Sequence, residues 1–259
     1  MSMRTGLDHL PEAKQRELAH VVRVLFEEFA EATARSTQPW KKAGRILKVI
    51  LYGSYARGDW VDDPVGGYKS DYDILVVVSD ERLTDVVDYW AAADDRLMRD
   101  MTISGVLSAP VGFIVHSLKD VNKQLEQGRP FFIDITEQGI ALYEAEGFGL
   151  AMPRKLPPEE ARAEAQKHFD QWFPSALRRL RTFEMEQREG KADPEWRRDA
   201  AFTLHQAVER LYHCTMLVLT LYSPLCRARH NGLYAERDTM PSGLGMCGFS
   251  GNFAAIGAA

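Results

Sequence analysis

Two short apolar runs constrain the fold of this chain most strongly. The first run, residues 46–52, ends at Gly53, and the second run, residues 74–78, is rich in β-branched side chains. Runs of this length and composition are typical of strands that are buried in a sheet. The intervening residues 59–69 include a proline and two glycines, which favour a loop. We therefore predict two buried strands that are connected through this loop.

The rest of residues 1–150 adds helices and further strands to these two. Apolar side chains recur at helical spacing over residues 11–34 and form one stripe on that helix. Ser117 followed by Asp120 resembles a capping box, which would open a helix that ends at Gly128. Another helix and two more strands are expected at residues 83–90, 111–115 and 140–143. The predicted fold class of this part is therefore α+β, with a mixed β-sheet.

The pattern changes beyond this first part. Residues 147–158 collect two glycines and three prolines without periodicity, so we place a domain boundary there. Two long helical patterns follow, and a turn near residues 191–194 would join them as an antiparallel pair. Regular patterning ends after Pro224. The predicted organisation is a domain over residues 1–150, an all-α domain over residues 157–224 and an irregular tail over residues 225–259.

Composition narrows the class of protein. The formal net charge of -5 argues against a protein that coats nucleic acid through bulk electrostatics, although it leaves a nucleotide substrate open. The three cysteines Cys214, Cys226 and Cys247 lack a paired spacing and fit reduced thiols. The first residues are too acidic for a secretory signal, and no apolar run has the length of a membrane span. We therefore expect a cytoplasmic protein without a membrane partner.

The two predicted strands carry the residue types that phosphate and metal chemistry need. Gly53 and Ser54 follow the first strand, and a strand that turns into a helix there would expose backbone N–H groups to a phosphate. Asp71 and Asp73 lie two residues apart at the start of the second strand, so their carboxylates leave the same face. Such a pair suits Mg²⁺, which would assist displacement at the α-phosphorus of a nucleotide.

Four neighbouring side chains have two interpretations each. Arg57 either approaches a triphosphate from the helix that follows the Gly-Ser turn or is a solvated helix residue, and we count it among the nucleotide-binding residues. Lys69 either offsets the repulsion between the carboxylates or contacts a phosphate. Trp60 and Tyr68 either stack on a base or pack against the protein.

The order Gly-Ser, spacer, Asp-x-Asp resembles the signature of nucleotidyltransferases of the polymerase beta superfamily, in particular the minimal nucleotidyltransferase (MNT) type. The resemblance covers about residues 11–145. It implies that Gly53 and Ser54 hold the nucleotide phosphates and that Asp71 and Asp73 bind Mg²⁺ and are catalytic. Sixteen residues separate Ser54 from Asp71, more than this signature usually spans. The loop between them therefore resembles an insertion, which could shape acceptor specificity.

One feature departs from this superfamily. Many of its members place a third carboxylate on a later strand, where it completes the metal site and serves as general base. The matching strand here, residues 111–116, contains no acidic residue. Three explanations stay open: the enzyme works with two carboxylates, which we favour; Asp134 or His116 substitutes; or the activity is impaired.

The helical part, about residues 160–224, resembles a HEPN domain (higher eukaryotes and prokaryotes nucleotide-binding), which is often fused to an MNT domain. Residues 201–212 and 219–224 carry this resemblance. HEPN ribonucleases use an Arg and a His at a wider spacing than that of Arg210 and His213, so we expect no RNA cleavage. The further helices of such a bundle are absent from the pattern after residue 224, as in a truncated or frameshifted domain. We expect its apolar surface to be covered in a homodimer.

Together these features predict transfer of a nucleoside monophosphate, most simply AMP from Mg²⁺ATP, to a hydroxyl of a protein or small molecule. The MNT and HEPN resemblances suggest a protein acceptor and an antitoxin-like role in a toxin–antitoxin system. One alternative is an antibiotic-modifying nucleotidyltransferase, which pairs the same catalytic half with a helical substrate half. The other is a catalytically weak nucleotide-binding module whose helices bind a partner.

Overall fold

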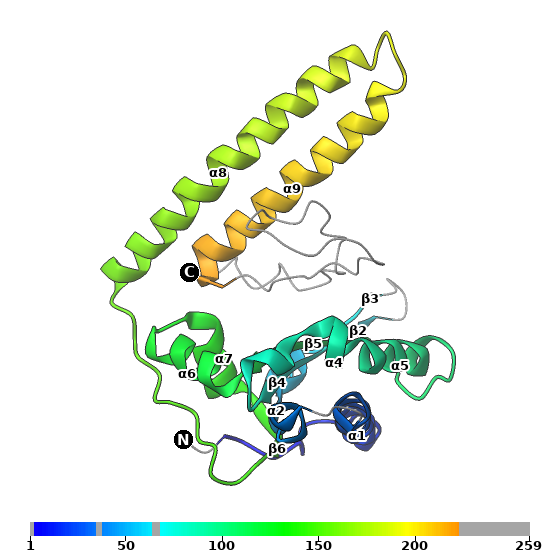
Figure 1. Cartoon of the computed structure of the whole chain (residues 1–259), viewed down its shortest axis with the longest axis vertical. Coiled ribbons are helices and arrows are strands. Elements are labelled where there is room, and N and C mark those ends of the chain that lie inside the picture. Colours follow the sequence, from blue (N-terminus) through cyan, green and yellow to red (C-terminus); the bar gives the residue numbers. More distant parts are fainter. Residues whose placement is uncertain (1–2, 35–37, 64–67, 223–259) are drawn as a thin grey trace. The chain divides into compact units, whose positions relative to one another are not determined.

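The computed structural model of the chain describes residues 3–34, 38–63 and 68–222 (Figure 1). These residues form two compact units. The first unit comprises residues 3–127 and 132–154, and the second comprises residues 128–131 and 155–222. The tail predicted at residues 225–259, with Cys226 and Cys247, lies outside the described residues.

A four-stranded mixed sheet forms the centre of the first unit. Its strands are β1 (Ile46–Tyr52), β4 (Tyr72–Val78), β5 (Val111–Ser117) and β6 (Ile140–Glu144), in the spatial order β5-β4-β1-β6. Strand β1 runs antiparallel to β4 and β6, whereas β4 and β5 are parallel. The two strands that the apolar runs predict are thus the central pair, where both faces are covered. The α+β class with a mixed sheet is confirmed.

Helix α1 (Glu12–Ala34) supplies one wall of the core. Its buried apolar residues are Leu18, Val21, Val24, Leu25 and Phe29, which recur at helical spacing and join the core cluster of the strands. The predicted helix at residues 11–34 is therefore confirmed to within one residue. The short helix α2 (Pro39–Lys42) lies between α1 and β1 in the sequence.

The helix predicted at residues 83–90 is wrong as a single element. The chain forms a 3₁₀ turn, η1 (Glu81–Thr84), then α4 (Val86–Tyr89) and α5 (Ala91–Thr102). Asp80 accepts a hydrogen bond from the backbone N–H of Arg82, and Asp85 accepts from those of Val87 and Asp88. Each carboxylate caps a new turn, and Asp85, which lies inside the predicted range, divides it into separate pieces.

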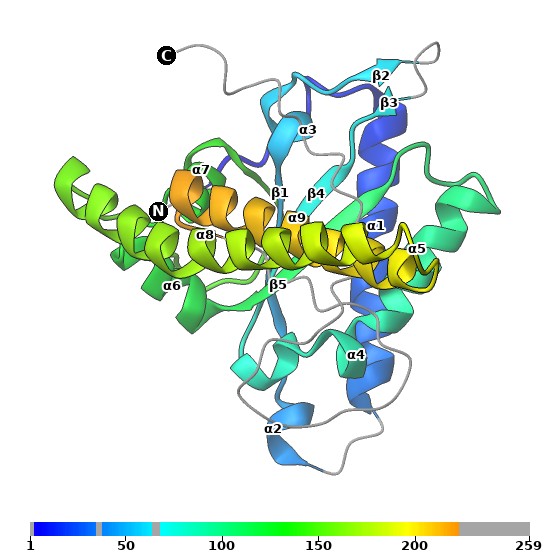
Figure 2. The same cartoon turned by 90° about the horizontal axis from the view of Figure 1, so that it is seen from above.

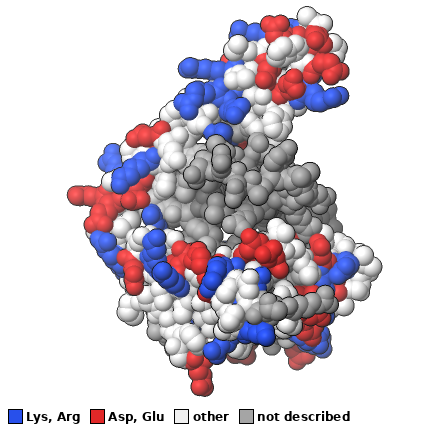
Figure 3. All heavy atoms as spheres, in the orientation of Figure 1, with Lys and Arg blue, Asp and Glu red and all other residues white. Residues whose placement is uncertain are grey.

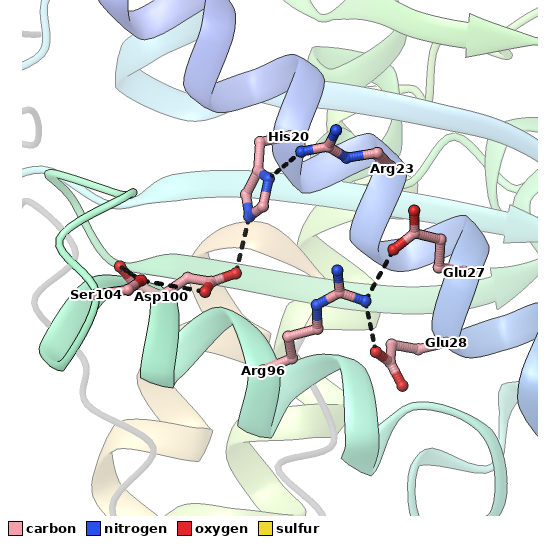
Figure 4. Close-up of polar contacts among 7 residues, drawn as sticks. All are labelled: His20, Arg23, Glu27, Glu28, Arg96, Asp100 and Ser104. Carbon is pink, nitrogen blue, oxygen red and sulfur yellow. Dashed lines mark hydrogen bonds and ion pairs between the residues drawn. The ribbon is translucent and has the colours of Figure 1, made fainter.

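Polar side chains join α1 to α5 (Figure 4). The Arg96 guanidinium lies 2.8 Å from carboxylate oxygens of both Glu27 and Glu28. Nε2 of His20 lies 2.8 Å from Asp100 Oδ2, and Arg23 Nη2 lies 2.7 Å from His20 Nδ1. Because a guanidinium only donates, Nδ1 is the acceptor and Nε2–H donates to Asp100. This bond holds the pKa of Asp100 below its usual range.

Helices α6 (Leu118–Glu126) and α7 (Pro130–Gln138) precede β6. The Ser117 hydroxyl accepts from the backbone N–H of Asp120 at 3.1 Å, so the predicted N-cap is confirmed. The sequence pattern predicted the end of α6 at Gly128 but no helix after it, whereas α7 begins at Pro130. Proline at the first position of a helix lacks only an N–H that would have no partner there, so the same residue also begins a helix.

The second unit is an antiparallel pair of long helices, α8 (Pro158–Glu189) and α9 (Trp196–Thr220), which lie side by side in Figures 1 and 2. The buried side chains along the pair are Ala176, Ala200, Thr203, Ala207 and Cys214. Most of these are small, which lets the two backbones approach closely. Several large apolar side chains stay exposed, including Phe169, Met185, Trp196, Phe202, Tyr212 and Leu219.

The described surface fits the composition of the chain. On the face shown in Figure 3, Lys and Arg side chains occur alongside Asp and Glu over both units. None of the described helices combines the length and the hydropathy that crossing a membrane would require.

Candidate functional site

The site begins where β1 ends against β4. Tyr52, the last residue of β1, pairs with Asp73 in the antiparallel ladder. Gly53 follows with a positive φ of 72°, and a Cβ built on it would meet Asp73 Oδ2 at 2.2 Å. Any side chain at Gly53 would therefore clash with the Asp73 carboxylate as well as strain the backbone. The expected reason for this glycine was close approach of a phosphate; the contact that requires it here is with Asp73.

The chain then turns into α3 (Gly53–Arg57), a helix of five residues. Ser54 is buried, and its carbonyl accepts hydrogen bonds from Gly58 N at 2.9 Å and Asp59 N at 3.1 Å. Gly58 adopts the left-handed conformation that ends the helix. Tyr52, the N-cap residue of α3, makes no side-chain capping bond to the helix. The backbone N–H groups at this end are therefore the donors that the sequence predicts for a phosphate.

Two carboxylates share one face beside this turn. Asp71 directly precedes β4 and Asp73 is its second residue, so both side chains leave the same face of the strand, and both residues are half-buried. Desolvation, and after it the charge of Asp71, raise the pKa of Asp73 to about 7, although Arg57 opposes the rise. Two acidic groups are thus held close enough to repel each other.

This donor set fits a divalent cation. Oδ1 of Asp71 has almost no contact with solvent, and a cation between the two carboxylates would relieve their repulsion. Carboxylate oxygens are ligands that Mg²⁺ prefers, and it usually completes its shell with water and phosphate oxygens. Within the described residues, no group of three or more His, Cys, Asp and Glu side chains is placed to hold a metal. The site therefore offers two carboxylates.

The strand neighbour of Asp73 is a glycine rather than an acidic residue. In the parallel ladder Asp73 pairs with Gly112 of β5, and a Cβ added to Gly112 would meet nothing within 4 Å. His116 pairs with Val77, four residues farther along β5, and its Nδ1 lies 2.7 Å from Asp120 Oδ2. This position is about 13 Å along the strand from Gly112, so His116 is a poor substitute for the missing acid.

The Arg57 guanidinium acts on Asp134 of α7 as well as on Asp73. Desolvation and the nearby Glu137 raise the pKa of Asp134, and the Arg57 guanidinium opposes that rise. Arg57 acts in the same sense on Asp73, and its Nε lies 3.2 Å from Asp59 Oδ2. Arg57 thus faces a group of carboxylates rather than bulk solvent alone.

The loop between the two motifs is partly regular. It contains the hairpin strands β2 (Asp62–Asp63) and β3 (Tyr68–Lys69), whereas residues 64–67 lie outside the described residues. The Lys69 ammonium lies 3.6 Å from Asp62 Oδ1 and donates to the Ser108 carbonyl at 3.3 Å. The Trp60 ring stacks on the Tyr55 ring, with centroids 5.3 Å apart. Of the two interpretations given for Trp60, the structure supports packing against the protein.

Three residues near the N-terminus support the site and were not predicted from the sequence. Arg4 donates to the carbonyls of Ala56 on α3 at 2.8 Å and of Gln138 on α7 at 2.9 Å. On α1, Lys14 is buried although it is charged, and Glu17 accepts a hydrogen bond from Tyr72 at 3.0 Å. The only signal for the last two was a pair of charges one helical turn apart on a helix that packs into the core.

Comparison with known proteins covers this site. Residues 37–145 match a family model described as "Polymerase beta, Nucleotidyltransferase". The match includes the four sheet strands, α3 and both aspartates, but less than half of the chain. No curated protein and no solved structure was found to match. The first unit therefore contains a polymerase-beta-like nucleotidyltransferase domain, and a helical region follows it.

Proposed function

We propose that this protein transfers a nucleoside monophosphate, with AMP from Mg²⁺ATP as the first candidate, to a hydroxyl acceptor. The observation that carries the proposal is the Asp71 and Asp73 pair, packed against the Gly53 turn at the end of β1. This arrangement lies within the residues that match the nucleotidyltransferase family model.

Each residue of the site has a proposed role. The backbone of Gly53 and Ser54 donates N–H groups to the triphosphate, and Arg57 offers positive charge to the same group. Asp71 and Asp73 hold Mg²⁺, which when bound would neutralise charge on the phosphates and stabilise the in-line transition state. The acceptor oxygen bonds to the α-phosphorus, pyrophosphate leaves, and the hydroxyl proton passes to a base.

The acceptor is proposed from the organisation of the chain. The helical unit after the catalytic domain is consistent with a HEPN-like interpretation, from which we propose a protein hydroxyl as the acceptor and an antitoxin-like role in the cytoplasm. An antibiotic-modifying enzyme is the rival within the same reaction class. The exposed apolar residues of α8 and α9 support self-association of this unit, and we expect no RNA cleavage.

The test is transfer of a labelled nucleotide. The full chain is incubated with Mg²⁺ and each of the four labelled nucleoside triphosphates, in the presence of cell extract or aminoglycosides. We expect Mg²⁺-dependent label on an acceptor, and a loss on the order of a thousandfold in Asp71→Asn and Asp73→Asn. Wild-type transfer by a folded Asp73→Asn variant would show that the metal assignment is wrong.

One observation favours a second candidate function, a nucleotide-binding module with weak activity. Gly112 stands beside Asp73 where a third acidic side chain would have open space. If two carboxylates limit the activity, Gly112→Asp should raise the affinity for Mg²⁺ and the rate of transfer, whereas Gly112→Asn should not. An unchanged or lower rate in Gly112→Asp, with strong wild-type activity, would favour the enzyme with two carboxylates.

A further inference from the structure

The residue between the two candidate metal ligands is anchored on the opposite side of the strand. Tyr72 separates Asp71 from Asp73, so its side chain leaves the other face of β4, where it is completely buried. Its hydroxyl donates to Glu17 Oε2 of α1 at 3.0 Å, and its backbone N–H donates to the Pro110 carbonyl at 2.8 Å. Tyr72 is therefore held by both its side chain and its backbone.

The acceptor of this bond is itself fixed. The Glu17 carboxylate accepts from Ser108 N at 3.0 Å and from Ser108 Oγ at 2.7 Å. Lys14, one turn earlier on α1, donates to the same Ser108 hydroxyl at 2.6 Å. A positive and a negative side chain are thus linked through one hydroxyl, which compensates the charge that each brings to the edge of the core.

Aromatic rings enclose this group. The Lys14 ammonium lies 5.5 Å from the ring centroids of both Tyr55 and Tyr72, and 5.7 Å from that of Trp60. The Tyr55 ring contacts the Tyr72 ring, with centroids 4.3 Å apart. Tyr72 is therefore enclosed by rings as well as bonded through its hydroxyl.

The position of Tyr72 at the start of β4 explains how its bond to Glu17 could fix the two aspartates. Asp73 is the first residue of β4 that pairs with β1, so Asp71 lies beyond the end of that ladder. Tyr72 lies between Asp71 and Asp73. Its bond to Glu17 would therefore hold both carboxylates in place at the start of β4, where pairing with β1 ends.

We infer that Glu17 and Tyr72 are positioning residues for the metal site, which hold Asp71 and Asp73 at the separation that one divalent cation requires. Ser108 and Lys14 keep Glu17 oriented for this role. The inference deepens the proposed function and rests on it. Lys14 and Glu17 precede the residues that match the family model.

The experiment measures metal binding rather than turnover. Mn²⁺ is titrated onto the full chain, and free Mn²⁺ is followed by electron paramagnetic resonance well below the unfolding temperature. Tyr72→Phe removes only the hydroxyl, and we expect Mn²⁺ to bind it on the order of fivefold more weakly. Tyr143→Phe is the matched control, because this tyrosine lies on β6 and packs against Phe26. It should bind Mn²⁺ as the wild type does.

Two further variants make the result decisive. Glu17→Gln should weaken Mn²⁺ binding to a similar extent, and the double variant Glu17→Gln with Tyr72→Phe should be little weaker than either single variant. If Tyr72→Phe does not fold, Ser108→Ala replaces it as the test of the same link. A purely structural role would lower the melting temperature of these variants without changing Mn²⁺ affinity, and that result would overturn the inference.

Failure of the inference and failure of the proposed function are distinguishable through Asp71→Asn. If Asp71→Asn weakens Mn²⁺ binding while Tyr72→Phe and Glu17→Gln bind as the wild type does, only the positioning role is lost. If Asp71→Asn also binds Mn²⁺ as the wild type does, the metal site itself is misassigned and both conclusions are overturned.

Discussion

The two units of this protein bury very different kinds of side chain. In the first, large residues such as Trp90, Tyr72 and Phe132 are almost completely buried among strands and helices. Along the whole of α8, by contrast, Ala176 is the one described residue that is buried. The difference follows from the kinds of element in each unit. Buried strands need cover on both faces, whereas two helices can pack along a narrow seam. The comparison suggests that the first unit carries its own stability, whereas the helix pair depends on further contacts.

Matched tryptophan substitutions should give the largest difference between the units. Trp90 is fully buried, and its indole N–H donates to the Leu83 carbonyl at 2.8 Å. Trp90→Ala should lower the free energy of unfolding by about 3–5 kcal/mol, because it leaves a cavity and a carbonyl without its donor. Trp196, at the start of α9, is 41% exposed, and Trp196→Ala should change stability by less than about 0.5 kcal/mol. Denaturant unfolding of both variants checks this; equal losses would break the comparison.

The seam of the helix pair should respond to added volume. Ala207 is 1% exposed on α9, so Ala207→Leu should destabilise the pair by about 1–3 kcal/mol through overpacking. Val208, its neighbour, is exposed, and Val208→Leu serves as the control. Hydrogen exchange of amides in α8 and α9 measures the effect directly. Similar exchange in the two variants would mean that the seam lies elsewhere.

A smaller effect is expected at the nucleotide turn of the first unit. Ser54→Ala removes one hydroxyl that could meet a phosphate, and it should weaken ATP binding by about 1 kcal/mol, or about fivefold in Kd. Calorimetric titration with Mg²⁺ATP is the measurement. Ser79→Ala, just beyond the other end of β4, should leave the affinity unchanged. Unchanged affinity in Ser54→Ala as well would leave the turn without a role in nucleotide binding.

The smallest expected effect concerns the contact between α1 and α5. The pKa of Asp100 lies below its usual range because His20 donates to it. The stability from this shift is therefore present above the pKa of an unfolded aspartate and is lost as the pH falls through the lowered value. Asp100→Asn should cost about 1 kcal/mol or less near neutral pH, and this difference should vanish in acid. Urea unfolding at about pH 6 and pH 3 tests both the size and the sign.

Much of the site was predictable because its parts are local. The apolar runs placed β1 exactly where it lies and β4 to within two residues at its start. The spacing of Asp71 and Asp73 was enough to put both on one face, since alternation is a property of any strand. The Gly-Ser turn and the Ser117 cap were visible for the same reason. Each of these depends on residues that are neighbours in the sequence.

Other features were not predictable from local patterns. Pro130 could equally end one helix or begin another, and Asp85 divided a run whose apolar spacing suited one continuous helix. Lysine is a residue type that mostly stays exposed, yet Lys14 is buried among rings from α3, the following loop and β4. In each case a contact or cap outweighed the periodicity that the sequence displays.

The central strands, the long helices and the same-face aspartates follow from local sequence, because hydrophobic periodicity and strand alternation act over a few residues. Three contacts follow from the tertiary structure alone: Asp73 fills the space beside Gly53, Gly112 pairs with Asp73, and Tyr72 reaches Glu17. These contacts join residues far apart in the chain. They depend on strand register and on helix packing, which residues throughout the unit determine together.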